Sequence, residues 1–174
     1  DLNDASAAHI HQGFAGQNGG VVLSLDQDAD DINHWMATGE FTQEQVDMLW
    51  AGGLYVNVHS SMNPAGEVRG QLMADNIKVV WADLSGSNQV PPVDTIASGR
   101  AALTINNDTM AVVLHAMTAD LDDATAAHIH QGFAGENGGV VLGLEQDADD
   151  MNHWWAAGEF TQEQVDMLWA GGLY

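Results

Sequence analysis

A long internal repeat dominates this sequence of 174 residues. Residues 1–55 recur as residues 120–174, an offset of 119, and 47 of the 55 aligned positions are identical. The largest difference between the two copies is Met36 against Trp155. Such near-identity indicates recent duplication in a tandem array, in which every repeat folds in the same way. The sequence therefore predicts one kind of domain arranged in series.

Turn residues indicate where one repeat ends and the next begins. Asp75-Asn76 closes one strand-like stretch, and Ile77 opens another. We expect residues 1–76 to be the C-terminal part of one repeat and residues 77–174 to be the N-terminal part of the next. On this reading the chain begins inside one repeat and stops inside another. Each part would then be completed by self-association with neighbouring repeats or chains.

Composition excludes several classes of partner. The chain carries 25 acidic residues against 3 basic ones, which gives a formal net charge of -22. Nucleic acids and anionic membrane surfaces both require clustered Lys and Arg, so neither is an expected partner. No apolar run approaches the roughly 18 residues of a membrane span. Cys is absent, which excludes disulfides, thiol catalysis and thiolate metal sites.

Short segments with strand-like patterns recur along the chain. Asn63-Pro64-Ala65-Gly66 is a strong turn signal that joins two of them as a hairpin. The predicted strands are residues 54–59, 67–73, 77–84, 100–105, 110–117 and 126–130. This pattern predicts a mainly β protein with one Greek-key or immunoglobulin-like β-sandwich per repeat.

One short helix is expected in each repeat. Thr42 and Gln45 form a capping box, and Gly52-Gly53 supplies the stop. Val46, Leu49 and Trp50 have the i, i+3, i+4 spacing of an apolar helix face, through which we expect the helix to pack. Residues 161–172 repeat the pattern.

Four motifs together resemble the CHRD domain, the module named after chordin. They are residues 84–92 (LSGSNQVPP), 127–132 (AHIHQG), 55–59 (YVNVH) and 64–72 (PAGEVRGQL). The resemblance covers nearly the whole chain in repeat order, although residues 26–41 fit it less well. It implies an extracellular or cell-surface β-sandwich, often in tandem. It also implies a distant likeness to the copper-zinc superoxide dismutase barrel, which places a His-x-His pair on a strand.

The histidines are candidate metal ligands. Residues i and i+2 of a strand share a face, so His9 and His11 present two imidazoles on one side, as do their second copies. Tyr55, Asn57 and His59 share one face of another strand, and we expect Leu54, Val56 and Val58 on its core side. The family motif makes His59 a third ligand. The predicted ligand set is His9, His11, His59, His115, His128 and His130.

Such imidazole clusters suit Cu(II), Zn(II) or Ni(II), and we expect copper first, with zinc as an alternative. The other interpretation is that the imidazoles hydrogen-bond to loop backbone and shape a turn. Residues 1–76 lack a counterpart of His115, and residues 77–174 lack a counterpart of His59. A complete site would therefore need pieces from adjoining repeats or chains.

An acidic loop follows the first His-x-His segment. Its carboxylates are spaced as in calcium loops, but it lacks the central Gly and the distal Glu of an EF-hand, so it is either a calcium site or a solvated loop. The carboxylates are Asp26, Asp28, Asp30 and Asp31. His34 and His153 lie next to Asp and Trp and are expected to pack in their loops rather than bind metal.

These observations favour an extracellular tandem-repeat structural protein that assembles into a filament or matrix, such as a biofilm matrix, and carries copper sites. A copper-sequestering protein and a copper-dependent enzyme of the superoxide dismutase type are the alternatives. The enzyme is disfavoured, because a similar fold does not carry an activity. No bridging His and Asp set for a second metal is recognisable, and no catalytic residue is predicted.

Overall fold

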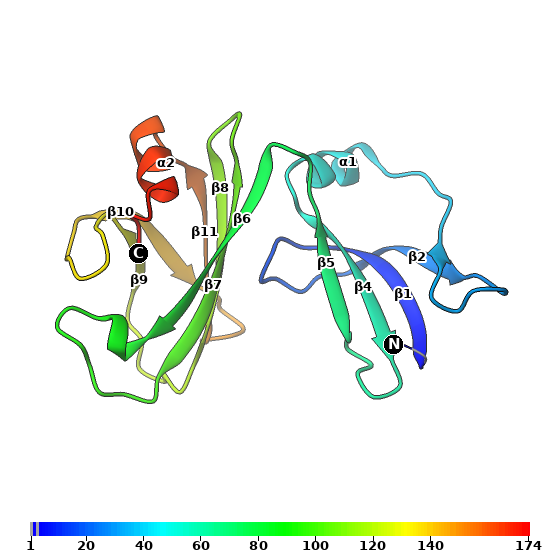
Figure 1. Cartoon of the computed structure of the whole chain (residues 1–174), viewed down its shortest axis with the longest axis horizontal. Coiled ribbons are helices and arrows are strands. Elements are labelled where there is room, and N and C mark those ends of the chain that lie inside the picture. The colour runs from blue at the N-terminus through cyan, green and yellow to red at the C-terminus, as the bar shows by residue number, and fades with distance from the viewer. Residues whose placement is uncertain (1, 3) are drawn as a thin grey trace. The chain divides into compact units, whose positions relative to one another are not determined.

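The computed structural model describes residues 2 and 4–174, which divide into two compact units, Asp1–Ile77 (unit 1) and Lys78–Tyr174 (unit 2). Each unit consists of one curled antiparallel sheet and one α-helix (Figure 1). The prediction of a mainly β, sandwich-type fold with one short helix per repeat is confirmed.

Unit 1 holds a five-stranded sheet. Its elements are β1 (Ala5–Gln12), β2 (Val21–Gln27), β3 (Trp35–Met36), α1 (Gln43–Trp50), β4 (Leu54–Ser60) and β5 (Val68–Leu72). The strand order is β3-β2-β1-β4-β5 with every pair antiparallel. Strands β1 to β3 are consecutive neighbours and β4 returns to lie beside β1, which is a Greek key.

Unit 2 holds a six-stranded sheet. Its elements are β6 (Ile77–Ser85), the short 3-10 helix η1 (Gly86–Asn88), β7 (Ser98–Asn106), β8 (Ala111–Ala119), β9 (Ala127–His130), β10 (Val140–Gln146), β11 (His153–Glu159) and α2 (Gln162–Trp169). The strand order is β6-β7-β8-β11-β10-β9, so β11 returns to β8 in a second Greek key.

The duplicated residues fold alike in both units. The offset of 119 places β1, β2, β3 and α1 in correspondence with β9, β10, β11 and α2. Among the described residues, unit 1 has no counterpart of β6 to β8, and unit 2 has none of β5. The difference is visible in β11, which runs from His153 to Glu159 because it pairs with β8, whereas β3 spans only Trp35–Met36.

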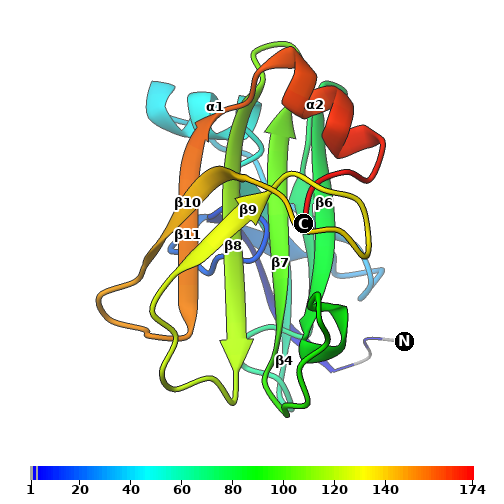
Figure 2. The same ribbon diagram turned by 90° about the vertical axis from the view of Figure 1, so that its left-hand side faces the viewer.

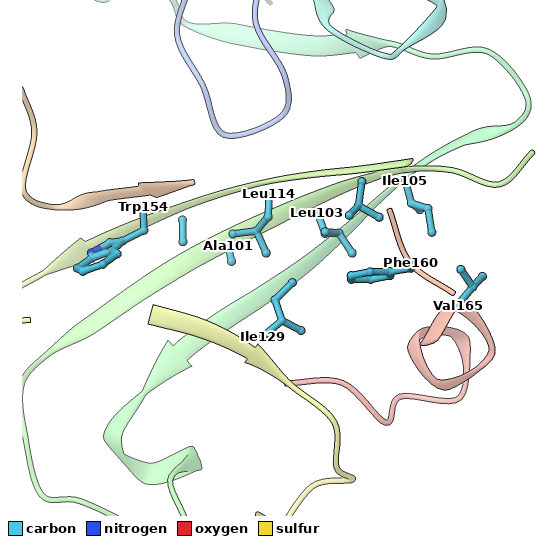
Figure 3. Packing of buried hydrophobic residues seen from close by; sticks show 10 residues of the cluster. Ala101, Leu103, Ile105, Leu114, Ile129, Trp154, Phe160 and Val165 are labelled. Atoms are coloured by element: carbon cyan, nitrogen blue, oxygen red, sulfur yellow. The ribbon is translucent and has the colours of Figure 1, made fainter. Parts of the chain in front are cut away.

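The core of unit 2 lies inside its curled sheet. Strand β9 faces β7 and β8 across this core, so Ile129 packs toward Leu103 and Leu114 (Figures 2 and 3). At one end, Phe160 and Val165 close the core beside Ile105 (Figure 3). These inward side chains are less than a tenth exposed, as expected of the face of a sheet that packs on a second layer.

The helices begin and end where the sequence predicts, but they do not pack as expected. Thr42 and Gln45 form the capping box of α1, and Thr161 repeats it in α2. Trp50 is 61% exposed, so it lies off the buried face, and the prediction that it packs the helix is wrong. No residue of α1 is buried, whereas in α2 Val165 is buried in the core and Leu168 packs against it. Neither helix is long and apolar enough to cross a membrane.

Strands β4 and β5 form the hairpin that the turn at residues 63–66 predicts. The cross-strand pairs Leu54 with Leu72 and Val58 with Val68 set the register. The expectation that Leu54, Val56 and Val58 mark the core side of β4 holds for Leu54 and fails for the two valines. Tyr55 and Asn57, on the opposite face, are almost fully buried, whereas Val56 and Val58 are only half-buried. Both faces of β4 are therefore covered, most fully at Leu54 on one face and at Tyr55 and Asn57 on the other.

Candidate metal centre

Three histidines of unit 1 converge from two neighbouring strands. His9 and His11 lie on β1, and His59 lies on β4 opposite Ala7, so it reaches the His-x-His pair diagonally. One ring nitrogen from each histidine lies within 4.8 Å of the other two. The sequence predicted this grouping from the i, i+2 spacing and from the motif at residues 55–59.

Backbone carbonyls fix the orientation of two of the rings. His11 Nδ1 lies 2.9 Å from the Gly19 carbonyl oxygen, and His59 Nδ1 lies 3.0 Å from the Pro64 carbonyl oxygen. A carbonyl only accepts, so both Nδ1 atoms donate, and both Nε2 atoms keep their lone pairs. His11 Nε2 is buried, and it has no hydrogen-bond partner among the described residues.

The His9 ring contacts the His59 ring directly. His9 Nδ1 lies 3.0 Å from His59 Nε2. Ligand nitrogens about 2.0–2.1 Å from a metal are roughly 2.9 Å apart in cis square-planar geometry and 3.3 Å apart in tetrahedral geometry. The observed separation suits two imidazoles on one ion. Buried imidazoles with their second nitrogen bonded to a carbonyl are also the usual arrangement of metal-bound histidines.

Tyr55 stacks on the His11 ring, and Arg69 lies over the Tyr55 ring. The Tyr55 ring lies parallel to the His11 ring, with centroids 5.1 Å apart, and its hydroxyl accepts a hydrogen bond from the Gly19 N–H. The Arg69 guanidinium lies 3.5 Å from the Tyr55 ring centroid and donates to the Gln17 carbonyl. These contacts hold the loop of residues 13–20 against β4, and with it the carbonyl that orients His11.

A second support fixes His59. The Asn57 amide donates to the Ala65 carbonyl oxygen at 3.3 Å. A Cβ at position 66 would lie only 2.4 Å from the Asn57 amide nitrogen, so the turn packs directly on this side chain. Asn57 therefore supports His59 through the turn that carries the Pro64 carbonyl.

The surroundings of His9 favour its neutral imidazole. Burial lowers the pKa of His9, and the neighbouring His59 and His11 lower it further. Neutral imidazole is the form that binds a metal ion. The cluster is therefore ready to bind a cation near neutral pH without first losing a proton from His9.

Unit 2 contains a second His-x-His pair, but the described residues add no third ligand to it. His128 and His130 have ring centroids 5.6 Å apart, against 5.5 Å for His9 and His11. His130 Nδ1 donates to the Gly138 carbonyl at 3.0 Å, which reproduces the His11 contact. Within the described part of the chain, no third histidine or carboxylate of unit 2 joins this pair in a ligand group.

His115 lies with a different partner from those predicted. Its Nδ1 lies 2.9 Å from His153 Nε2, and His153 Nδ1 lies 3.0 Å from an Asp147 carboxylate oxygen. Two strands separate β8 from β9, so the sheet order itself keeps His115 away from the His128 pair. The assignment of His153 to loop packing is also corrected, since His153 is the first residue of β11 and pairs across to β8.

The acidic loop turns its carboxylates to its own backbone. Asp28 accepts from the N–H groups of Asp30 and Asp31 and lies 3.3 Å from His34 Nδ1. The Asp30 N–H is the main reason that the pKa of Asp28 is lowered. Among the described residues, Asp26, Asp28, Asp30 and Asp31 form no convergent ligand group. Calcium binding here would require a rearranged loop.

Comparison with known proteins agrees with the sequence motifs. The family model of the CHRD domain matches residues 1–72 and 80–174. No curated protein and no solved structure matches the chain.

Proposed function

Because the chain belongs to the CHRD domain family, we propose that it is a secreted, extracellular tandem-repeat protein that binds a transition metal through His9, His11 and His59. The observation that carries this proposal is the buried His11 Nε2, which has no hydrogen-bond partner among the described residues and belongs to a three-imidazole group. A buried polar atom without a partner costs free energy, and a bound ion would remove that cost.

Copper(II) is the metal that this ligand set favours. Divalent first-row ions bind nitrogen ligands in an order that peaks at copper, and zinc follows. The chain offers no thiolate, which is the ligand type that would favour copper(I) or structural zinc. The net charge of -22 raises the local concentration of cations and supports loading.

Calorimetric titration of the metal-stripped chain with Cu(II) tests the proposal. We expect His59→Ala to weaken binding at least tenfold, because His59 is the ligand that joins the His-x-His pair. His34→Ala is the matched control, since His34 is exposed and lies outside the cluster. Binding should also weaken in acid, because protons compete with the metal for the imidazole nitrogens, and the lowered pKa of His9 places its own protonation below the ordinary imidazole value of about 6.5. Equal binding by the wild type and His59→Ala would refute the proposal.

The repeat also supports a structural role. We propose that residues 1–76 and 77–174 are parts of successive CHRD repeats and that such arrays assemble into a filament or matrix. The near-identical copies and the strands that each unit lacks among the described residues support this organisation. Electron microscopy of the native material would show regular fibres or sheets if it is correct, and dispersed particles if it is not.

A further inference from the structure

A line of three polar side chains crosses β8 and β11 in unit 2, apart from the His128 and His130 pair. His115 Nδ1 lies 2.9 Å from His153 Nε2, and His153 Nδ1 lies 3.0 Å from an Asp147 carboxylate oxygen. Strands β8 and β11 are neighbours in the interior of the sheet, between β7 and β10. Pairing within unit 2 therefore determines where His115 and His153 lie, and no edge of the sheet is involved.

The Asp147 carboxylate fixes which nitrogen of His153 carries the proton. A carboxylate only accepts hydrogen bonds, so His153 Nδ1 donates to Asp147, and Nε2 of the neutral ring keeps a lone pair. His115 Nδ1 therefore carries the proton that lies between the two rings. Asp147 is itself held by the Asp149 N–H at 2.9 Å. Metal-bound histidines are oriented in the same way, by a carboxylate on their second nitrogen.

The two rings meet edge to edge through these nitrogens. Their planes are 14° apart and their centroids are 5.1 Å apart, so the lone pair of His153 Nε2 points along the bond to His115 Nδ1. A copper(I) ion, which is stable with few ligands, can take the place of the shared proton, which then moves to His115 Nε2. With bonds of about 2.0 Å, the two nitrogens must separate from 2.9 Å to roughly 4 Å. His153 is the first residue of β11, so the adjoining loop can supply this shift.

Met117 offers a soft ligand on the same face. It lies directly opposite His153 in the ladder and two residues after His115 on β8, so the three side chains point to one side. Directly opposite residues have Cβ atoms about 4.5–5.5 Å apart, and diagonal neighbours are farther apart. His115 already contacts His153 across the diagonal, so the flexible Met117 thioether is within reach of the same point. Met117 is 40% exposed, which gives an ion access from solvent.

We propose that His115, His153 and Met117 form a second metal site, which holds copper(I), and that Asp147 is a positioning residue for His153. A thioether is a soft ligand, and soft ligands select copper(I). The candidate metal centre of unit 1 has imidazoles alone, so the two sites differ in the oxidation state that they prefer. The site in unit 2 goes beyond the proposed function and does not depend on the centre in unit 1.

Anaerobic competition with bicinchoninate, a chelator that is coloured when it binds Cu(I), measures the affinity. His59→Ala is the parent protein, because it lacks the complete unit 1 centre. In this parent, His153→Ala should weaken Cu(I) binding at least tenfold. His34→Ala in the same parent is the matched control, since His34 is the equivalent residue of unit 1 and its side chain is 56% exposed. Near-UV circular dichroism checks that each variant is folded.

X-ray absorption of the Cu(I)-loaded parent tests Met117 directly. We expect a copper–sulfur contribution that Met117→Leu removes, because Leu has a similar volume but no sulfur. This variant tests the site even if His153→Ala does not fold.

The role of Asp147 has a readout of its own. Asp147→Asn should lower the Cu(I) affinity about 10- to 100-fold. In the metal-free protein, the ¹⁵N chemical shifts of His153 should change from one tautomer to a mixture. Asp28→Asn, at the equivalent position of unit 1, should change neither measurement.

The inference is overturned if His153→Ala binds Cu(I) as tightly as its parent does. It is also overturned if the copper–sulfur signal is absent from the parent or persists in Met117→Leu. The Cu(II) titration of the wild type and His59→Ala tests the proposed function separately, so the two failures are distinguishable.

Discussion

Gly19 determines where the imidazole of His11 points. Its carbonyl accepts the His11 Nδ1–H, and its N–H donates to the Tyr55 hydroxyl. A Cβ at this position would lie 1.6 Å from the Gln12 carbonyl oxygen, which is backbone and cannot move aside. Only glycine allows this close approach, so the loop geometry at Gly19 is part of the candidate metal site.

Gly19→Ala should therefore weaken Cu(II) binding by about 10- to 100-fold, the usual effect of losing a group that orients a metal ligand. The neighbouring Gly20 is the matched control, because a Cβ there meets nothing within 4 Å. Gly20→Ala should bind as the wild type does. Competition titration against a chelator of known affinity measures both variants, and equal affinities would show that the carbonyl of residue 19 does not orient His11.

At this scale the sequence predicted that His9, His11 and His59 lie together, but not the residues that support them. The i, i+2 spacing of His9 and His11 was sufficient to place two imidazoles on one face. The loop that carries the Gly19 carbonyl is held by contacts between residues 36 and 52 positions apart, Gly19 with Tyr55 and Arg69 with Gln17, so no local pattern reveals them.

Pairing between β8 and β11 distinguishes unit 2 from unit 1 at the level of elements. Seven residues of β11 pair with β8, from His153 with Met117 to Glu159 with Ala111. The sequence of β11 resembles residues 34–40 closely, yet only Trp35–Met36 forms a strand in unit 1. A strand made by a distant partner cannot be predicted from its own residues. The helices and the β4–β5 hairpin could be predicted, because their caps and turn are local.

Burial of His115 between these strands makes the stability of unit 2 sensitive to pH. Burial lowers the pKa of His115 to about 4, and the neighbouring His153 adds to the effect. In the unfolded chain its pKa is near 6.5, so between pH 6.5 and 4 the unfolded state takes up a proton that the folded state does not. Stability should fall by roughly 3 kcal/mol as pH drops through this window.

Urea titration of the metal-free protein at pH 7 and at pH 4.5 measures this dependence. His115→Gln keeps a neutral hydrogen-bonding group and should remove most of the pH-dependent loss. Asp147 contributes to the pH dependence of stability in a lower pH range. The Asp149 N–H and His153 lower its pKa, so its contribution is lost only below about pH 4. If His115→Gln loses as much stability between pH 7 and pH 4.5 as the wild type does, groups other than His115 cause the pH dependence.

The charge of the whole molecule opposes its compact form. Three basic residues cannot neutralise 25 acidic ones, and Arg69 is directed at the Tyr55 ring and loop carbonyls. Arg100 pairs with Asp83 at 3.5 Å, but both side chains are largely exposed, so the pair contributes little. Uncompensated charge of one sign destabilises a folded protein through self-repulsion.

Salt should therefore stabilise the protein at neutral pH. Raising NaCl from about 0.01 to 0.1 M shortens the screening length from about 30 to 10 Å. If this screening recovers about 1 kcal/mol, the melting temperature should rise by about 2–4 °C. The measurement uses chelator-treated protein, so that bound metal does not contribute. Near the sequence pI of 4.1 the net charge vanishes, and the same salt step should change Tm little. A Tm at pH 7.5 that stays constant or falls with NaCl would show that the carboxylates are too well solvated to repel one another.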